Sequence, residues 1–435
     1  MQPGTDPTGR PLAGAGRSRA RLVVLVLMSV GTMINYLDRA VLGVAAPSMT
    51  KELGLDAVVM GIVFSVFSWT YAAAQIPGGA FLDRVGVRLA YFWSVTVWSL
   101  FTFLQGLATG LYSLVFYRLG LGVAEAPCFP ANSRILSSWF PQHERARATS
   151  AYSVGQYFGL AFLSPLLFWI VATLGWRALF IIAGGLGFVF AAIWFRMYRD
   201  PHESPRVNQA ELDYIEAGGG LGHAGPPARF EWRNIGLLLR KRQILGAAIG
   251  QFGGNSTLVF FLTWFPTYLA TERQMEWLKV GFYAVLPFIA ASVGVIAGGW
   301  LSDRIIHRTG SATVGRKLPI LTGLLLASTI IAANYVDSDQ LVILIMSIAF
   351  FGQGMVNLGW TLLTDVAPKR LIGLSGGIFN LVANLAGIVT PIVIGIIVGR
   401  TGSFVGALAY VGTVAAIGAL SYIFVVGEVR RVEID

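Results

Sequence analysis

The chain has 435 residues, of which 55% are hydrophobic and only 12% are charged, and its mean hydropathy is +0.66. Charged residues make up about a quarter of ordinary soluble domains, so this composition excludes a soluble globular protein. Apolar stretches of about 20 residues, long enough to cross a bilayer as a helix, recur along the chain and leave room for about twelve spans.

The net charge of +10 on its own would also suit a protein that binds nucleic acid. The placement of the charges favours a different explanation for this excess of basic residues. With twelve spans and a cytoplasmic N-terminus, the outer loops hold few basic residues, namely Lys51, Arg177, Arg273, Lys279 and Arg400. Most of the 32 lysines and arginines then fall on the cytoplasmic side, which is the bias that orients membrane proteins. We therefore expect both termini in the cytoplasm and no nucleic-acid partner.

The predicted spans form two groups of six, separated by a polar segment. The first group covers residues 22–46, 57–82, 89–108, 111–139, 146–174 and 176–198. The second group covers residues 243–269, 278–302, 318–336, 341–366, 372–398 and 404–426. The sequence therefore predicts an all-α membrane protein with twelve transmembrane helices in two six-helix halves.

Polar segments divide the chain into five parts. In order, these are a disordered cytoplasmic tail (1–20), an N-terminal six-helix bundle (21–198), a cytoplasmic linker (199–241), a C-terminal six-helix bundle (242–427) and a second tail (428–435). The first tail lacks an apolar core and is not expected to be a signal peptide. In the linker, Asn208 followed by Glu211 predicts a short helix that ends at Gly218.

Cysteine and histidine offer little chemistry. The single cysteine, Cys128, excludes an intrachain disulfide and falls inside the fourth predicted span, where a buried thiol is the usual state. The histidines lack metal-ligand spacing and are scattered, at His143, His202, His223 and His307. The glycine-rich runs match no phosphate-binding loop. We therefore expect no metal, no cofactor and no enzymatic activity.

A short charged motif occurs once in each half. The first copy follows the second predicted span and contains Gly79, Asp83, Arg84 and Arg88; the second copy follows the eighth and contains Gly299, Asp303 and Arg304. We expect Gly79 to let two helices approach closely and Arg84 to find a carboxylate across the bundle. Duplication at half the chain length is typical of transporters that bind their substrate between two halves, near the middle of the membrane.

Two pairs of charged residues fall in the interior of the first and fourth predicted spans. Arg118 and Glu125 are two turns apart, so they share a helix face and lie about 10 Å apart along the axis. Asp38 and Arg39 are adjacent, about 100° apart around their helix, so they cannot both aim at one point. A charge in hydrocarbon costs at least ~2.5–3.5 kcal/mol, which predicts that these side chains face the protein interior. The pattern indicates a cavity for an anion, with carboxylates that can take up protons.

The repeated motif resembles the signature of the major facilitator superfamily. Three further stretches, NYLDRA, GVAEAPCFPANSR and WFPQHERARA, resemble its anion:cation symporter family. The chain after its first tail is similar to bacterial proton symporters for hexonates and hexarates, the galactonate, glucarate and galactarate carriers. The resemblance implies a major facilitator fold of two pseudo-symmetric halves in a bacterial inner membrane. It also implies import of a sugar-acid anion by alternating access.

The resemblance assigns roles to particular residues. In that family the acidic residue of the first helix and the glutamate of the fourth take the coupling protons, which here are Asp38 and Glu125. Positions around the substrate match Tyr36, Arg39, Tyr71, Arg118, Gln156, Asn357, Trp360 and Asn380. Guanidinium groups suit a carboxylate and amides suit hydroxyls. Asp83, Arg84, Arg88, Asp303 and Arg304 are expected to form a cytoplasmic gate. A purely structural ion-pair network and ordinary hydrogen bonding between helices stay open as competing interpretations.

The sequence leaves the substrate open between a hexarate and a hexonate. Asp365 and the stretch GLSGGIFN resemble the glucarate carriers, whereas GQYFGLAFLSP resembles the galactonate type. Asp365 also lies near the cytoplasmic end of its helix, where a solvated or gate-pairing carboxylate is expected. A carrier of a hexuronate or another organic anion, an uncoupled uniporter or exchanger, and a membrane sensor also stay open. The protein is expected to act as a monomer, with protons as the coupling ion.

Overall fold

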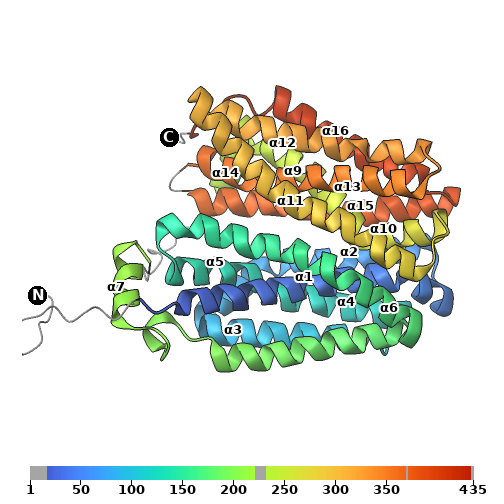
Figure 1. Ribbon diagram of the computed structural model, residues 1–435, viewed down its shortest axis with the longest axis horizontal. Helices are drawn as coiled ribbons and strands as arrows, with labels where there is room; N and C mark the ends of the chain where they lie inside the picture. Colours follow the sequence, from blue (N-terminus) through green and yellow to red (C-terminus); the bar gives the residue numbers. More distant parts are fainter. Residues whose placement is uncertain (1–16, 221–231, 369–370, 433–435) are drawn as a thin grey trace, which may run out of the picture.

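The computed structural model describes residues 17–220, 232–368 and 371–432, and every regular element within them is a helix (Figure 1). The N-terminal half contains α1 Ala20–Leu53, α2 Ala57–Ala73, α3 Gln75–Gln105, α4 Leu111–Glu125, α5 Cys128–Trp139 and α6 Gln142–Met197. The linker contains the 3-10 helix η1 Pro201–Glu203, α7 Gln209–Ala217 and α8 Trp232–Leu239. The C-terminal half contains α9 Arg242–Thr263, α10 Phe265–Thr267, the π-helical turn η2 Tyr268–Glu272, α11 Trp277–Thr309, α12 Ala312–Ser328, the 3-10 helix η3 Thr329–Tyr335, α13 Asp339–Val356, α14 Gly359–Val366, α15 Ile372–Thr401 and α16 Val405–Phe424.

Nine helices in the described part of the chain are long and apolar enough to cross a membrane. This number is below twelve because predicted spans are joined or divided in several places. The fifth and sixth spans form the single helix α6, which bends at Gly175, where φ is 83°. The second span is divided between α2 and the start of α3, and α3 continues into the third span across a bend at Gly86. All twelve predicted segments are therefore helical, but their boundaries differ.

Two predicted spans are interrupted near their middle. The fourth is divided into α4 and α5 at Ala126 and Pro127, because proline has no N–H to continue the helical hydrogen bonding. The tenth is divided into α13 and α14 at Asn357 and Leu358. The breaks place Glu125 at the last position of α4 and Asn357 at the end of α13, so each half presents one polar side chain at a helix interruption.

Three features near the helix ends differ from, or extend, the sequence prediction. Helix α1 continues past the predicted residue 46 to Leu53, where Gly54 ends it in a left-handed conformation. The predicted linker helix is confirmed as α7, with the Asn208 side chain accepting from the backbone N–H of Glu211. Helix α8 was not predicted, although Leu238 buries its side chain completely in the C-terminal half.

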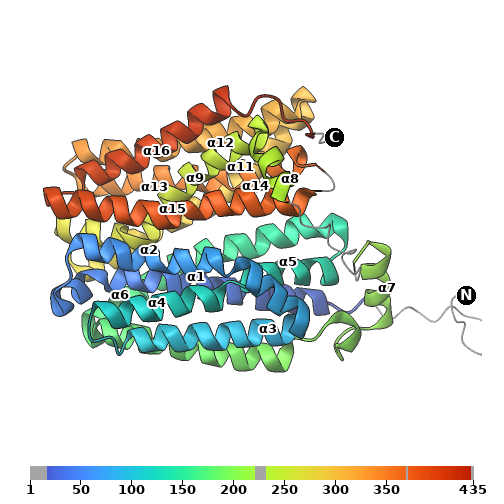
Figure 2. The same ribbon diagram turned by 180° about the vertical axis from the view of Figure 1, so that it is seen from behind.

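The two halves lie side by side, and the linker helices lie at one end of the molecule (Figures 1 and 2). We call the end with α7 and the start of α1 the linker end, and the opposite end, where α1 finishes at Leu53, the far end. Between the halves, α2 packs against α15, α6 packs against α11, and α1 packs against α9 and α10.

The hydrophobic core is shared at the far end and divided at the linker end. One cluster combines residues from both halves, including Met49 and Met60 with Trp264 and Phe404. The remaining core residues form one cluster confined to the N-terminal half and its attached linker helix α7, and another confined to the C-terminal half and α8. The halves are therefore sealed together at the far end and keep separate cores at the linker end.

Glycines along α2, α3 and α15 show the same asymmetry. At the far end, a Cβ added to Gly61 would lie 2.5 Å from the carbonyl oxygen of Pro391 and 3.3 Å from the Cα of Gly395. At the linker end, a Cβ added to Gly79 or Gly377 would meet nothing within 4 Å. The prediction that Gly79 allows close helix contact is wrong for this conformation, because the halves diverge there; the neighbouring Gly78 instead packs against Pro127.

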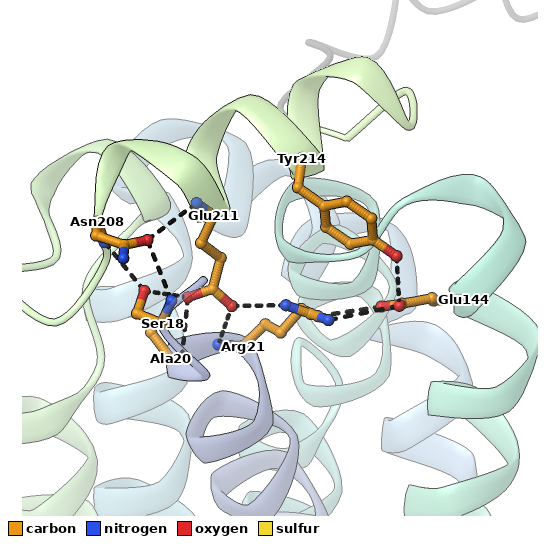
Figure 3. Close-up of polar contacts among 7 residues, drawn as sticks. All are labelled: Ser18, Ala20, Arg21, Glu144, Asn208, Glu211 and Tyr214. Atoms are coloured by element: carbon orange, nitrogen blue, oxygen red, sulfur yellow. Dashed lines mark hydrogen bonds and ion pairs between the residues drawn. The ribbon is translucent and has the colours of Figure 1, made fainter. Parts of the chain in front are cut away.

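Helix α7 is attached to the N-terminal half by polar contacts (Figure 3). The fully buried Glu211 carboxylate accepts from the backbone N–H groups of Ala20 and Arg21 at the start of α1, at 3.0 and 3.3 Å. Arg21 bridges Glu211 and Glu144, at 2.9 and 3.1 Å, and Tyr214 donates to Glu144 at 2.7 Å. The last residues of the predicted N-terminal tail thus belong to this ordered contact, while residues 1–16 lie outside the described part.

Candidate functional site

A buried ion pair joins α1 to the end of α4 in the predicted site. Arg39 of α1 donates from Nε and Nη2 to Oε2 of Glu125, at 3.0 and 2.9 Å. The Glu125 side chain is fully buried, whereas the Arg39 side chain keeps 16% of its surface exposed. Arg39 therefore neutralises the carboxylate, and its side chain is not completely enclosed.

Aromatic rings surround Arg39. Its guanidinium lies 5.3 Å from the ring centroid of Tyr36, 4.8 Å from that of Phe67 and 4.8 Å from that of Tyr71. Cation–π contacts of this kind hold a guanidinium in place without consuming its hydrogen-bond donors. The structure therefore brings together three residues that the sequence assigned to substrate binding, Tyr36, Arg39 and Tyr71, and adds Phe67 to them.

Arg118 of α4 is a buried cation with few partners. Its side chain is 3% exposed, Nη2 donates to the carbonyl oxygen of Phe64 at 3.4 Å, and the guanidinium lies 5.0 Å from the Phe67 ring. Its Nε and Nη1 have no hydrogen-bond partner among the described residues. These free donors are suited to bind an anion.

Asp38 faces α3 and makes no ion pair among the described residues. Its side chain is 1% exposed and faces Trp98 and Thr102 of α3, and neither carboxylate oxygen has a hydrogen-bond partner among the described residues. The expectation that Asp38 and Arg39 face different directions is confirmed. An ion-pair network of all four charged residues is not formed among the described residues, since Glu125 pairs with Arg39 and Asp38 pairs with neither arginine.

The C-terminal half contributes amides and a tryptophan. Asn380 of α15 accepts through Oδ1 from Nδ2 of Asn384 at 3.0 Å. Trp360 of α14 is 40% exposed and contacts the edge of Phe379, the residue before Asn380, at a centroid distance of 4.9 Å.

Tyr157 lies next to the last two predicted substrate residues, Gln156 in the chain and Asn357 through a hydrogen bond. It follows Gln156 on α6, and its hydroxyl accepts from Nδ2 of Asn357 at 3.2 Å and donates to Oε1 of Gln353 at 3.3 Å. Gln156 itself is 7% exposed. The described contacts do not include one between these residues and Arg39.

The repeated charged motif lies at the linker end, as its position in the sequence implied. Asp83 pairs with Arg134 of α5 at 2.7 Å, and Arg88 donates to the carbonyl oxygen of Phe195 at 2.8 and 3.2 Å. Arg84 makes no ion pair within the described residues, so the carboxylate partner expected for it is absent in this conformation. Arg304 lies over the Trp300 ring at 5.4 Å.

Arg316 contacts Asp303 of the second motif and also Asp365. Its Nε donates to Asp365 at 2.9 Å, and its Nη1 lies 2.9 Å from the Ser302 hydroxyl and 3.5 Å from Asp303. Asp365 is therefore tied to the motif at the helix end, which is the gate-pairing position expected from its place in the sequence.

Several polar residues of the interior were not anticipated. Asn35 is completely buried beside Glu125, and Asn132 donates to Thr32 at 3.2 Å. In the C-terminal half, amides recur one helical turn apart as Gln251 and Asn255, Gln353 and Asn357, and Asn380 and Asn384. Amide pairs at this spacing inside apolar helices were a usable signal, because they share a face and must hydrogen-bond something within the bundle.

Comparison with protein families places the chain. Residues 28–391 match the model of the Major Facilitator Superfamily. The chain belongs to this superfamily. It is 45% identical to a D-galactonate transporter of Escherichia coli O6:H1, covering 97% of this chain and 99% of the relative, and 45% identical to a probable galactarate/D-glucarate transporter of Escherichia coli K12, covering 96% of each. A probable galactarate/D-glucarate transporter of Bacillus subtilis is 42% identical, covering 96% of this chain and 94% of the relative. These relatives are transporters, not enzymes.

Solved structures confirm the fold. Two crystal structures of a bacterial homologue of the human lysosomal transporter Spinster superimpose with TM-scores of 0.69 and 0.70. They are 20% and 21% identical, cover 94% of this chain, and are covered over 97% and 98% of their own lengths. Both are inward-facing, one occupied and one unoccupied. At this identity the likeness establishes the shared architecture of two six-helix halves.

Proposed function

We propose that the protein is a proton-coupled symporter that imports a sugar-acid anion, either a hexarate or a hexonate. The observation that carries the proposal is the ion pair between Arg39 and Glu125. One carboxylate that gains a proton can release one guanidinium, and the arginine side chain is the partly exposed member of the pair. The names of the relatives support the substrate class, since those named above are galactonate or galactarate/glucarate transporters.

Charge placement supports an orientation with the linker end in the cytoplasm. The far end holds the ion pair of Arg177 with Glu52, at 2.9 Å, and the pair of Lys279 with Asp339, at 2.7 Å, so its few basic residues are partly neutralised. The linker end holds the basic clusters of the two motifs and of the linker. By the positive-inside rule, the linker end faces the cytoplasm of a bacterial inner membrane. With that orientation, the sealed far end makes this an inward-facing conformation.

The proposed cycle begins with the far end open. Protons reach Asp38 and Glu125, and the neutral Glu125 no longer holds Arg39. Arg39 and Arg118 then bind the carboxylate of the substrate, and the amides of the C-terminal half bind its hydroxyls. Protons and anion therefore bind with positive cooperativity, because each favours the state that the other needs.

Release follows once the far end closes and the linker end opens. In the more alkaline cytoplasm Glu125 loses its proton and pairs again with Arg39, which removes the main attraction for the anion. The described conformation, with Arg39 paired and the halves separate at the linker end, corresponds to the state after release. The protein acts as a monomer in this proposal, with protons as the only coupling ion.

Uptake into liposomes tests the proposal. The purified protein is reconstituted, and labelled glucarate, galactarate, galactonate and a hexuronate are offered with and without an inside-alkaline pH gradient. Concentrative uptake of a hexarate or a hexonate that requires the gradient is the expected result. Transport indifferent to the gradient would identify a uniporter or exchanger, and preference for the hexuronate would replace the substrate class. Saturable binding without any transport would indicate a sensor.

A further inference from the structure

The two halves are joined by a polar contact at the border of their shared core. Tyr157 lies in the N-terminal half on α6, and its two hydrogen-bond partners, Gln353 and Asn357, lie in the C-terminal half on and at the end of α13. All the side-chain hydrogen bonds described between the halves involve this tyrosine. The ion pairs described within residues 17–220, 232–368 and 371–432 each join groups of the same half or of its attached linker segment.

The contact is well protected from water. Tyr157 is completely buried and Gln353 is 1% exposed, while Asn357 is partly exposed. Gln353 and Asn357 are one turn apart, so one hydroxyl engages both by donating to the first and accepting from the second. Breaking the contact without replacement leaves the buried Gln353 oxygen unpaired, which is unfavourable in a bundle that excludes water.

The neighbouring packing belongs to the sealed side of the molecule. The Tyr157 ring meets the edge of Phe350 at 5.9 Å, and Phe350 stacks on Phe261 at 4.0 Å. All three belong to the cluster that both halves share, and Tyr36 of the candidate site packs against the same cluster. Tyr157 therefore stands between the sealed core and the predicted substrate residues Gln156 and Asn357.

We propose that the Tyr157 hydroxyl is a positioning group that holds α13 of the C-terminal half to α6 and thereby stabilises the conformation sealed at the far end. Rocking of the halves moves α6 relative to α13, so the two hydrogen bonds break each time the far end opens. Asn357, one of the two partners, is also a substrate residue in the proposed function. This inference rests on the proposed function, because only a transporter needs its two halves to alternate between conformations. The tyrosine thus sets the balance between the two conformations of the carrier.

The test measures how often the far end opens. Ala46 is 1% exposed and lines a cavity of about 260 Å³ between the halves at the far end, together with Met60, Trp264 and Phe404. Ala46→Cys, made in a Cys128→Ala background, reports opening as the rate of maleimide labelling of the purified full-length protein. Tyr157→Phe should raise this rate about three- to tenfold, as expected for the loss of a hydrogen bond within a membrane bundle.

We call the two hydrogen bonds of Tyr157 with Gln353 and Asn357 the tether. Two further variants distinguish loss of the tether from a general loss of packing. Gln353→Met removes the other end of one hydrogen bond and should raise labelling similarly, and the double variant should exceed neither single variant by much. Tyr422→Phe is the matched control, because that tyrosine is also fully buried but its hydroxyl has no described partner. Its labelling rate should stay at the parent value.

Labelling requires no substrate, so the result is independent of the transported compound. If Tyr157→Phe labels at the parent rate, or if the effects of Tyr157→Phe and Gln353→Met multiply, the tether is wrong even where sugar-acid uptake succeeds. A labelling increase confined to these two variants supports the tether even if uptake of sugar acids fails and the proposed function is wrong.

Discussion

Both hydrogen bonds from Arg39 to Glu125 end on the same carboxylate oxygen, Oε2, while Oε1 is buried and has no described partner. A proton added to Oε1 therefore displaces neither hydrogen bond from Arg39, yet it removes the charge that holds Arg39. In the proposed function, the pair combines a site for a proton with a site for an anion, and protonation of the first exposes the second. This relationship supports linked binding better than an ion pair whose oxygens are all engaged.

Asp38→Asn should lower pH-driven accumulation of substrate at least about tenfold without unfolding the protein. The reason is that Asp38 makes no ion pair, so a neutral amide of the same shape leaves no partner charge unpaired. Accumulation in proteoliposomes and the melting temperature are the two measurements. An unaltered accumulation would show that Asp38 carries no coupling proton, and a collapsed melting temperature would show that its role is structural.

Arg118→Lys should weaken substrate binding about 10- to 100-fold, the equivalent of losing a charged hydrogen bond of ~1.5–3 kcal/mol. Lysine keeps the positive charge but cannot present two parallel donors to a carboxylate. Calorimetric titration of the purified protein with the transported sugar acid measures the change. The control is Arg177→Lys at the far end, which should bind normally because Arg177 is occupied with Glu52.

Gly79→Leu should fold normally and yet transport poorly, at less than about a tenth of the parent rate. The site is open in this conformation, with nothing within 4 Å of an added Cβ, but the linker end must close during the cycle and a bulky side chain blocks it. The control, Gly185→Leu on α6, has equally open surroundings and should transport normally. Normal transport by Gly79→Leu would mean that α3 does not meet the other half when the linker end closes.

Asp365→Asn should change the transport rate but leave the preference between hexarate and hexonate within about twofold. Asp365 is held by Arg316 beside the second charged motif, and Arg316→Gln should therefore reproduce its effect. Competition between labelled galactarate and galactonate measures the preference, with Asn380→Ala as the variant expected to change it. If Asp365→Asn alone inverts the preference, Asp365 contacts substrate and its gate role is wrong.

The fold could be predicted because its determinants are local. Twelve apolar segments of membrane length and one repeated motif specify two six-helix halves, and helix capping by Asn208 locates the linker helix. The helix interruptions were harder to predict from the sequence. Pro127 was visible in the sequence, but the break at Asn357 contains no proline, and the side chain of Asn357 there donates to Tyr157 of the other half.

The site could be predicted only in part, since partners depend on which conformation is adopted. That Asp38 and Arg39 diverge follows from the geometry of a helix, whereas the choice of Glu125 by Arg39 depends on how α1 meets the end of α4. The carboxylate partner expected for Arg84 likewise depends on the conformation, since Arg84 makes no ion pair among the described residues of this one. The pairing of residues across a rocking interface is therefore a property of a state, and a sequence specifies several states at once.

Gradient-driven accumulation by Glu125→Gln tests whether Glu125 carries the coupling proton. Proteoliposomes containing the parent protein or the variant are given labelled substrate under an inside-alkaline gradient, and exchange of internal for external substrate is measured beside it. The variant should lose accumulation and retain exchange, because a permanently neutral side chain leaves Arg39 free to bind the anion but cannot carry a proton. Accumulation at the parent level by Glu125→Gln would show that Glu125 carries no coupling proton.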